Sequence, residues 1–276
     1  MSPLSFTLSL LGISVLAGFM GSLLGLGGGI VVVPVLTLLY GIDIRYAIGA
    51  SIVSVIATSS GAAAAYVKER MTNLRVAMFL ELGTTTGAIT GAFLAGIIQG
   101  RWLQIIFGLV MGFSSLAMLR RERHGVPLPP SLLAGPLRLD GSYYDESLGR
   151  VVEYRVTRVR LGLLLMYCAG AISGLLGIGS GALKVPAMDL VMRLPIKVSS
   201  ATSNFMIGVT AAASAGVYFA RGDISPFIAA PVATGVVVGA TAGSLVLGRT
   251  DSRVLRAAFV ILLLLVSVQM VWKGLQ

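Results

Sequence analysis

The chain has 276 residues and a net charge of +10; hydrophobic residues make up 56% of it and charged residues only 12%. A soluble globular domain carries about twice that share of charge, so the composition excludes an ordinary soluble enzyme or binding module. Apolar runs of roughly 20 residues, the length that crosses a hydrocarbon core, indicate an all-α polytopic membrane protein in contact with the lipid bilayer. Basic residues are expected at membrane boundaries, so the positive charge does not indicate a nucleic-acid partner.

The first part of the chain divides into five apolar segments. The first segment lacks the basic n-region and the small-residue cleavage site of a secretory signal, so we expect it to be the first membrane helix. The second is only about twelve residues long, or roughly 18 Å of helix. It either re-enters the membrane or crosses it as a short helix that starts at depth. The five segments cover about residues 4–25, 30–41, 46–67, 74–98 and 102–120.

Residues 121–159 form a sizeable aqueous segment between two apolar regions. The run from Pro127 to Pro130 blocks a helix. The residues from Tyr143 to Val156 then follow a pattern that predicts a short β-hairpin. We expect this central loop to be a linker on the cytoplasmic face, with a regulatory role as the alternative.

The second part of the chain repeats the first at a constant offset of 152 residues. Shared Gly, Pro, Tyr and Arg at one offset are difficult to obtain by chance, so they indicate an internal duplication. The matched pairs include Gly18/Gly170, Pro34/Pro186, Ser51/Ser203, Thr58/Thr210, Tyr66/Tyr218, Gly87/Gly239 and Arg101/Arg253. The second set of apolar segments covers about residues 160–177, 182–193, 198–219, 226–248 and 253–273. The expected organisation is a first membrane repeat (1–120), the central loop (121–159) and a second membrane repeat (160–276).

The Lys and Arg distribution bears on orientation, because short cytoplasmic loops carry an excess of both. Setting aside Lys184, which lies inside a segment, leaves 20 of the 21 basic residues. They divide 16 to 4 between the two sides if each repeat crosses five times, and 13 to 7 if it crosses four times. The sharper asymmetry favours five crossings, inverted repeats, both termini outside and the central loop in the cytoplasm. The four basic residues on the minority side are then Arg45, Arg101, Arg221 and Lys273.

A glycine cluster interrupts each repeat before its short second segment, and a proline stands five residues after the last glycine. Irregular backbone at membrane depth is tolerated only where protein or a water-filled cavity surrounds it. Paired breaks of this kind indicate a transporter's binding site. We predict that the two breaks hold an anion at the amide groups of the helices that follow them; the alternative is that the glycines only allow close helix packing. The residues concerned are Gly27, Gly28, Gly29, Gly179, Ser180 and Gly181.

Lys184 and Glu81 are charged residues deep inside apolar segments, where burying a charge costs free energy and the residue is functional by default. Lys184 follows the second break, and we predict that it is the charge partner of the substrate. The alternatives are that it pairs with Asp189 or Glu81 or extends to the interface. Glu81 has Ala233 as its repeat counterpart, so an acid present in one repeat only is a candidate to carry a proton. It could equally bind Arg75 near the interface.

Polar residues begin the third segment of each repeat. Ser51 and Ser203 occupy matched positions, and Thr202 and Asn204 flank the second of them. Hydroxyl and amide groups can donate hydrogen bonds to an anion without adding a buried charge, so all four are candidate substrate ligands. Capping of the helix starts is the alternative.

Two glycine stripes follow small-xxx-small spacing, which allows helices in a membrane to pack closely. They would join helices within one chain or between the protomers of a homodimer. The stripes are Gly83-Gly87-Gly91 and Gly235-Gly239-Gly243.

Signatures of catalysis and of cofactor binding are missing. His124 is the sole histidine and Cys168 the sole cysteine, so we expect neither a metal site nor a catalytic triad. The first glycine cluster lacks the Gly-Lys-Ser/Thr ending of a phosphate-binding loop. We therefore expect no enzyme activity and no cofactor.

The combination of motifs resembles the TauE/SafE sulfite exporter family, also called the toluene sulfonate uptake permeases. The resemblance rests on the two glycine clusters through Pro34 and Pro186 and on Ala201-Thr202-Ser203-Asn204, and it extends over essentially the whole chain. It implies a multi-pass inner-membrane carrier for a small sulfur-containing or organic anion such as sulfite or a sulfonate. We expect alternating access around a central site that is lopsided, because Val32 stands where the second repeat has Lys184. The alternatives are a passive anion channel and a membrane scaffold or sensor that acts through the central loop.

Overall fold

The computed structural model describes residues 3–68, 71–119, 134–145, 148–247 and 250–276, so Pro127 to Pro130 and His124 lie outside the described residues. The described chain is mainly helical. In chain order the elements are α1 (Pro3–Leu24), α2 (Gly29–Pro34), η1 (Val35–Leu39), α3 (Ile44–Lys68), α4 (Leu74–Ala95), α5 (Gly100–Leu119), β1 (Gly141–Asp145), β2 (Arg150–Tyr154), α6 (Val159–Leu176), α7 (Gly181–Pro186), η2 (Ala187–Val191), α8 (Ile196–Ala220), α9 (Pro226–Leu247) and α10 (Ser252–Leu275).

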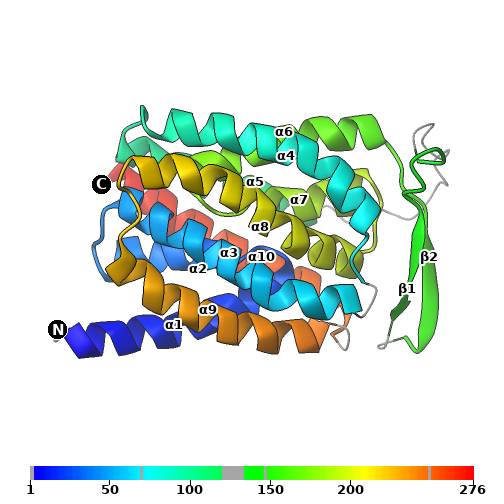
Figure 1. The fold of residues 1–276 in the computed structure, drawn as a ribbon, viewed down its shortest axis with the longest axis horizontal. Coiled ribbons are helices and arrows are strands. Elements are labelled where there is room, and N and C mark those ends of the chain that lie inside the picture. The colour runs from blue at the N-terminus through cyan, green and yellow to red at the C-terminus, as the bar shows by residue number, and fades with distance from the viewer. Residues whose placement is uncertain (1–2, 69–70, 120–133, 146–147, 248–249) are drawn as a thin grey trace.

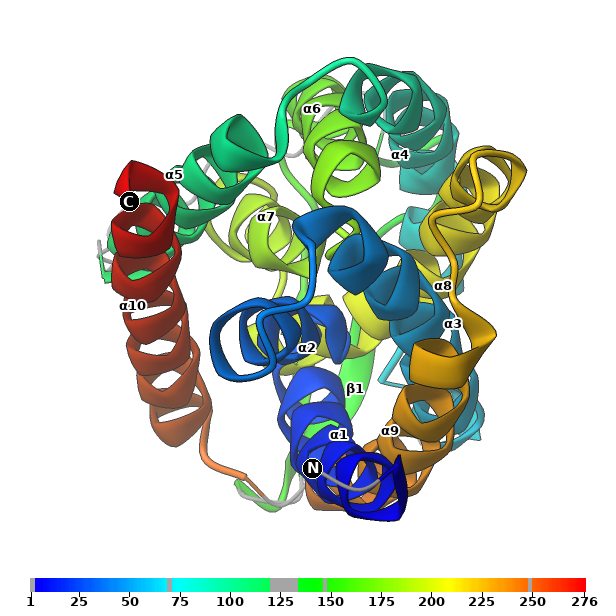
Figure 2. The same ribbon diagram turned by 90° about the vertical axis from the view of Figure 1, so that its left-hand side faces the viewer.

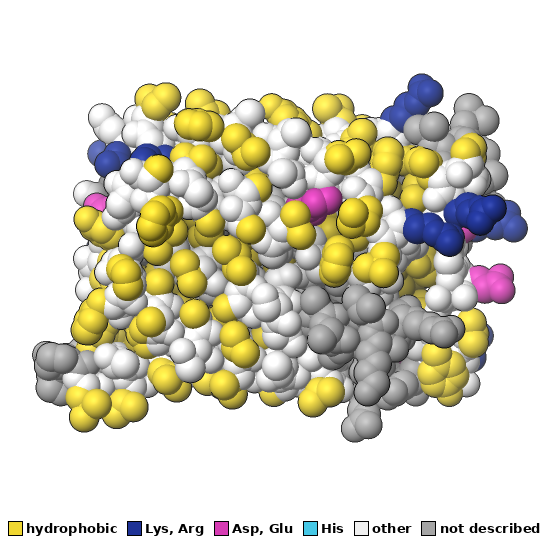
Figure 3. Space-filling view, in the orientation of Figure 1, with side chains coloured by type: hydrophobic (Ala, Val, Ile, Leu, Met, Phe, Trp, Pro, Cys, Tyr) yellow, Lys and Arg dark blue, Asp and Glu magenta, His cyan; other side chains and the backbone are white. Residues whose placement is uncertain are grey.

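The long helices lie side by side along one axis of the molecule (Figure 1). α1 begins and α10 ends at one end of this bundle, which we call the terminal end, and the two strands lie at the opposite, hairpin end. In the described part of the chain, five helices are long and apolar enough to cross a membrane: α1, α4, α6, α9 and α10. Figure 3 shows Lys and Arg side chains towards the two ends and a mainly hydrophobic and uncharged band between them, as expected for a protein surrounded by lipid.

Each short segment returns to the end of the bundle at which the preceding helix began. After η1, the ring of Tyr40 packs edge-on against Phe6 with 5.1 Å between centroids, close to the start of α1. After η2, the carbonyl of Met192 accepts a hydrogen bond of 3.1 Å from the amide of Thr157, just before α6. α2 and α7 each run without a gap into a π-helical turn. The glycine break thus turns the chain back inside the bundle.

The glycine stripes join helices from different parts of the same chain. α1 packs against α9 and α4 packs against α6. A Cβ atom at Gly87 would collide with the carbonyl oxygen of Tyr167, and one at Gly239 would collide with that of Val15. The two contacts are equivalent in the duplication, because Gly87 and Gly239 are 152 residues apart, as are Val15 and Tyr167. The stripes therefore allow close packing within one chain, which decides between the two predicted uses.

The described part of the central loop packs against the hairpin end of the bundle. β1 and β2 pair antiparallel, with Tyr143 opposite Val152. The Lys197 ammonium at the start of α8 lies 2.7 Å from the Asp145 carboxylate, and both side chains are buried. Burial and the neighbouring Asp145 carboxylate raise the pKa of Tyr143, so its phenol remains a donor and binds Asp145 at 2.9 Å. The hairpin is thus attached to the membrane bundle through a buried ion pair.

Candidate functional site

The glycine breaks owe their sequence to backbone geometry. Gly25 and Gly27 adopt φ angles of +70° and +71°, and Gly177 and Gly179 adopt +67° and +75°. Only glycine takes up this left-handed region without a steric cost. The Gly-x-Gly pattern therefore turns the chain sharply between α1 and α2 and again between α6 and α7.

The two breaks meet in the centre of the bundle, and Figure 2 shows α2 and α7 inside it, surrounded by the long helices. A Cβ atom at Gly181 would collide with the carbonyl oxygen of Gly25. The hydroxyl of Ser51 donates to the carbonyl of Gly177 at 2.7 Å, and the hydroxyl of Ser203 donates to that of Gly25 at 2.7 Å. The two donors are 152 residues apart in the sequence, and so are the two acceptors, so the hydrogen bonds are equivalent in the duplication. The serines thus hold each break against the other half of the chain, instead of capping α3 and α8.

The other two polar residues at the start of α8 have different surroundings. The Asn204 amide group donates to the carbonyl of Ser22, at the end of α1, while its side-chain oxygen is buried without a hydrogen-bond partner among the described residues. Thr202 accepts a hydrogen bond of 3.1 Å from the amide of Asn73, just before α4. The structure therefore brings Ser203 and Asn204 to the first break, and it places Thr202 against the start of α4.

Lys184 lies in α7 with its side chain fully buried. Its ammonium donates to the hydroxyl of Thr210 at 2.6 Å and lies 3.7 Å from Oε2 of Glu81. The Thr210 hydroxyl lies 2.6 Å from Oε1 of Glu81, to which Thr85 also donates at 3.1 Å. Of the predicted alternatives for Lys184, the structure has the ion pair with Glu81. Lys184 and Glu81 therefore belong to one site, which confirms one of the two pairings that the sequence left open.

The other predicted partners of these two charges bind elsewhere. Asp189 of η2 forms an ion pair of 2.5 Å with Arg256 of α10. Arg75 donates to the carbonyl of Arg138 in the central loop at 3.1 Å. The pair of Lys184 and Glu81 is thus separate from the charges at the hairpin end.

Thr210 is a member of the site that sequence reasoning missed as a ligand. The signal was present, because Thr58 and Thr210 are a matched pair of the duplication. At the first break the equivalent hydroxyl of Thr58 accepts a hydrogen bond of 3.2 Å from the amide of Gly28. Lys184 corresponds to Val32 and Glu81 corresponds to Ala233. In each of these matched pairs, only one residue carries a charge.

The centre of the bundle is closed in this conformation, since Gly27 to Gly29 and Gly179 to Gly181 are all buried. Two hollows open at the terminal end, with volumes of about 330 Å³ and 290 Å³. Neither hollow includes a residue of the breaks or of the Lys184 site among its lining residues. A solute that enters either hollow therefore reaches the breaks only if the helices around them move.

Broken helices that meet inside an apolar helical bundle, beside a buried charge pair, define the class of membrane transporters. The family model described as "Sulfite exporter TauE/SafE" matches residues 10–270. The chain belongs to this family, as its two glycine clusters predicted.

Curated relatives resemble the chain over almost its whole length. A protein of Bacillus subtilis (strain 168) named "Probable membrane transporter protein YunE" is 26% identical over 270 residues, which covers 95% of this chain and 96% of the relative. A "Probable membrane transporter protein" of Xylella fastidiosa (strain 9a5c) is 28% identical over 263 residues, with 94% and 92% covered. No solved structure gives a significant match.

Proposed function

We propose that the protein is a secondary transporter that moves a small sulfur-containing or organic anion, such as sulfite or a sulfonate, across the inner membrane. The observation that carries this proposal is the buried Lys184 ammonium beside the second glycine break, paired with Glu81 and bound to Thr210. A lone lysine at this depth is costly, and a carboxylate keeps it charged and in place. An anionic substrate can replace that carboxylate.

The ion pair suggests how substrate and proton are coupled. One oxygen of Glu81 is buried without a hydrogen-bond partner among the described residues, although it lies 3.7 Å from the Lys184 ammonium. Protonation of this carboxylate would remove the counter-ion of Lys184. The ammonium and the hydroxyl of Thr210 would then recruit the substrate anion. One proton on Glu81 and one negative charge on the substrate would travel together, without net charge movement.

The two halves of the chain are proposed to be inverted repeats that rock around this site. The matched hydrogen bonds of Ser51 and Ser203 support this, because each half holds the break of the other through the same pair of positions. The start of α1 and the hairpin, which precedes α6, lie at opposite ends of the bundle (Figure 1), and this also supports it. The excess of Lys and Arg around the hairpin end favours a cytoplasmic location for the central loop.

Opening the site on either side would release the breaks from each other. Ser51, Ser203 and Asn204 would then exchange their carbonyl partners for the substrate, together with the amide groups after Gly29 and Gly181. The closed centre favours this carrier mechanism over a passive anion channel, which needs a continuous aqueous path.

Transport by purified protein in proteoliposomes tests the proposal. We expect uptake of radiolabelled sulfite or a sulfonate that saturates with concentration and accelerates under an inward proton gradient. A thermal-shift screen with sulfite, thiosulfate, sulfonates and carboxylates identifies the anion to use. Flux that rises linearly with concentration and ignores the gradient would indicate a channel. Full activity after deletion of the hairpin would count against a scaffold that acts through the central loop.

A further inference from the structure

The basic residues at the terminal end surround its two hollows. Arg101 and Lys273 line the hollow of about 330 Å³ together with Asp43, whose carboxylate accepts a hydrogen bond from the amide of Arg45. Arg45 and Arg221 line the one of about 290 Å³ together with Asp223, which pairs with Arg221 at 2.7 Å. The four basic residues are the same four that the charge count assigns to the minority side. Because Lys and Arg are depleted on that side of a membrane protein, their restriction to two hollows indicates a local requirement for positive charge.

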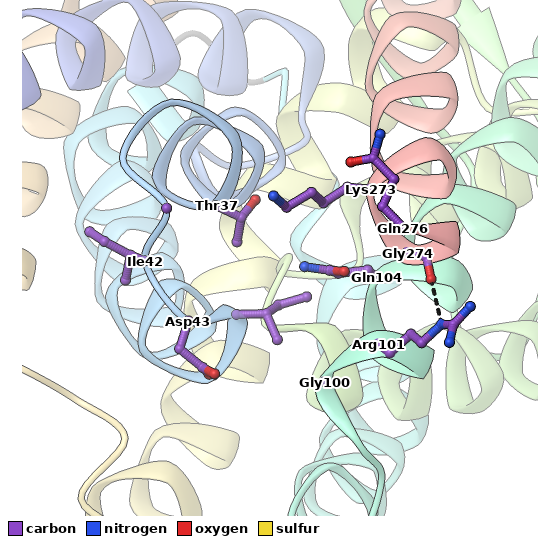
Figure 4. A pocket seen from close by; sticks show the side chains of 11 residues that line it. Thr37, Ile42, Asp43, Gly100, Arg101, Gln104, Lys273, Gly274 and Gln276 are labelled. Carbon is purple, nitrogen blue, oxygen red and sulfur yellow. Dashed lines mark hydrogen bonds between the residues drawn. The ribbon is translucent and has the colours of Figure 1, made fainter.

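The larger hollow offers hydrogen-bond donors that are not already used. Lys273 of α10 makes no hydrogen bond or ion pair with any described residue, and in Figure 4 its side chain extends towards Thr37 with Gln104 nearby. The Gln104 side chain of α5 also lines the hollow without a described hydrogen-bond partner. Arg101, in contrast, donates to the carbonyl of Gly274 at 2.9 Å. Lys273 and Gln104 are therefore the groups available to a ligand.

The floor of the hollow leads towards the first break. Thr37 lies in η1, is only 2% exposed, and donates to the carbonyl of Val33 at 2.8 Å. Val33 belongs to α2, which begins directly at Gly29. A ligand in the hollow would thus rest against the segment that runs from the break to the terminal end.

The residues that line the larger hollow have counterparts in the second half of the chain, and these show which groups can occupy the equivalent space. Thr37 corresponds to Asp189 and Gln104 corresponds to Arg256, each at the 152-residue offset. At the hairpin end these two residues form the ion pair of 2.5 Å between η2 and α10. A carboxylate of the protein itself, bound by a basic side chain, therefore fills the position that is a hollow at the terminal end.

We propose that the larger hollow at the terminal end is a second anion site, which takes a small carboxylate, sulfonate or sulfite-like anion from solution. Lys273 supplies the charge and Gln104 an amide donor, and the anion occupies the place that the Asp189 carboxylate takes in the other half. This site differs from the one at Lys184, and its occupancy does not depend on transport.

Thiol labelling measures the charge preference of this hollow. The exposed Cys168 is first replaced by Ser, and Gln104→Cys then supplies a reporter in the lining. The reporter reacts with an anionic sulfonatoethyl methanethiosulfonate or with its cationic trimethylammonium analogue. We expect the anionic reagent to react faster, and Lys273→Gln to lower the anionic-to-cationic rate ratio by on the order of tenfold. High salt should reduce the preference as well.

Arg45→Gln is the matched control, because it removes a positive charge from the same end but from the other hollow. It should leave the rate ratio nearly unchanged. A ratio that Lys273→Gln does not alter, or that Arg45→Gln alters equally, would overturn the proposal. Since Lys273 is exposed, its replacement does not endanger folding.

A second variant pair tests the correspondence with Asp189. Thr37→Asp puts a carboxylate on the floor of the hollow, and Thr37→Asn has nearly the same size without the charge. We expect Thr37→Asp to reverse the preference towards the cationic reagent and Thr37→Asn to retain the anionic preference. Equal ratios in the two variants would contradict the inference. A proteoliposome assay without any transport would leave these labelling results intact, so the two proposals fail independently.

Discussion

Lys184 is the residue whose environment constrains the mechanism most. Its ammonium is fully buried, and a Glu81 carboxylate with 13% side-chain exposure is its counter-ion. Moving each charge out of water costs several kcal/mol, which their attraction and the hydroxyl of Thr210 offset. Such a pair is weak evidence for a gain in stability. Lys184 is charged and its counterpart Val32 is not. Binding of an anionic ligand explains this difference better than stability does.

Lys184→Met should abolish transport and also destabilise the protein. Breaking a buried pair leaves one charge uncompensated, which costs roughly 3–5 kcal/mol. The double variant Lys184→Met/Glu81→Gln removes both charges and should recover most of the thermal stability. We expect substrate affinity to fall by on the order of 100-fold in both variants, which corresponds to about 2.7 kcal/mol. Thermal unfolding and uptake, measured together, separate the two effects.

Lys197→Met is the matched control for this experiment. Lys197 is also fully buried and paired with a carboxylate, but it binds Asp145 of the hairpin. It should lose thermal stability and retain substrate affinity. If Lys184→Met kept wild-type affinity, Lys184 would be a structural residue.

Glu81→Gln should remove the pH dependence of transport. In the proposed mechanism a proton on Glu81 frees the Lys184 ammonium, so an inward proton gradient is expected to accelerate uptake by the wild type. Glutamine stays neutral at every pH and leaves Lys184 permanently free for the anion. The variant should therefore still bind the substrate near neutral pH and lose acceleration of uptake by a proton gradient. A pH profile identical to that of the wild type would exclude Glu81 as the coupling group.

At the scale of the elements, glycine determines how closely the helices approach. Gly91 of α4 faces the carbonyl of Ala171 in α6, and a Cβ atom at Gly91 would collide with it. Its matched partner Gly243 of α9 meets Phe19 and Ser22 of α1. The two helix pairs α1–α9 and α4–α6 thus depend on bare backbone at their contacts.

Gly91→Ala should therefore lower the thermal stability of the protein, since overpacking typically costs about 1–3 kcal/mol. Gly216→Ala in α8 is the control, because nothing lies within 4 Å of a Cβ atom there. That substitution should be neutral or stabilising by up to about 1 kcal/mol, the difference in helix propensity. Melting temperatures in the same detergent decide the comparison. Equal melting temperatures for the two variants would mean that α4 and α6 do not depend on this close contact.

Hydropathy and glycine spacing carry most of the element-level information in the sequence. The predicted segment 74–98 appears as α4 (Leu74–Ala95), and the short segment 30–41 appears as α2 and η1. Each of these signals is local, because a helix of the right length or a Gly-x-Gly turn needs no distant partner to be recognised. The family resemblance rested on the same local motifs.

Contacts between distant segments were not predictable in the same way. Lys184 and Glu81 are about a hundred positions apart, and nothing local distinguished Glu81 from Asp189 as the partner. Ser51 and Ser203 were predicted as free donors or as helix caps, but each binds the carbonyl of a break in the other half. Which groups share a site depends on how α4, α7 and α8 cross, and single positions do not encode that.

At the scale of the whole molecule, the two ends differ in how tightly they are closed. The hairpin end is held by the ion pair of Asp189 and Arg256 and by that of Asp145 and Lys197. The matched positions at the terminal end border the two hollows and include Thr37, Gln104 and Arg45. The ion pair at the terminal end, between Arg221 and Asp223, is local in sequence, whereas those at the hairpin end join different elements. In an alternating-access cycle the charge pairs at the hairpin end would have to separate.

Neutralising Asp189 tests this asymmetry between the ends. Asp189→Asn removes the charge attraction to Arg256 between η2 and α10, where the two side chains are 9% and 30% exposed. We expect amide hydrogen exchange in residues 187–196 to accelerate by about tenfold, equivalent to about 1.4 kcal/mol. Exchange in residues 37–45 at the terminal end should not change. Asp43→Asn at the terminal end is the control, because Asp43 accepts only a local hydrogen bond from the Arg45 amide among its described contacts. If Asp189→Asn left exchange at the hairpin end unaltered, this ion pair would not be what holds that end closed.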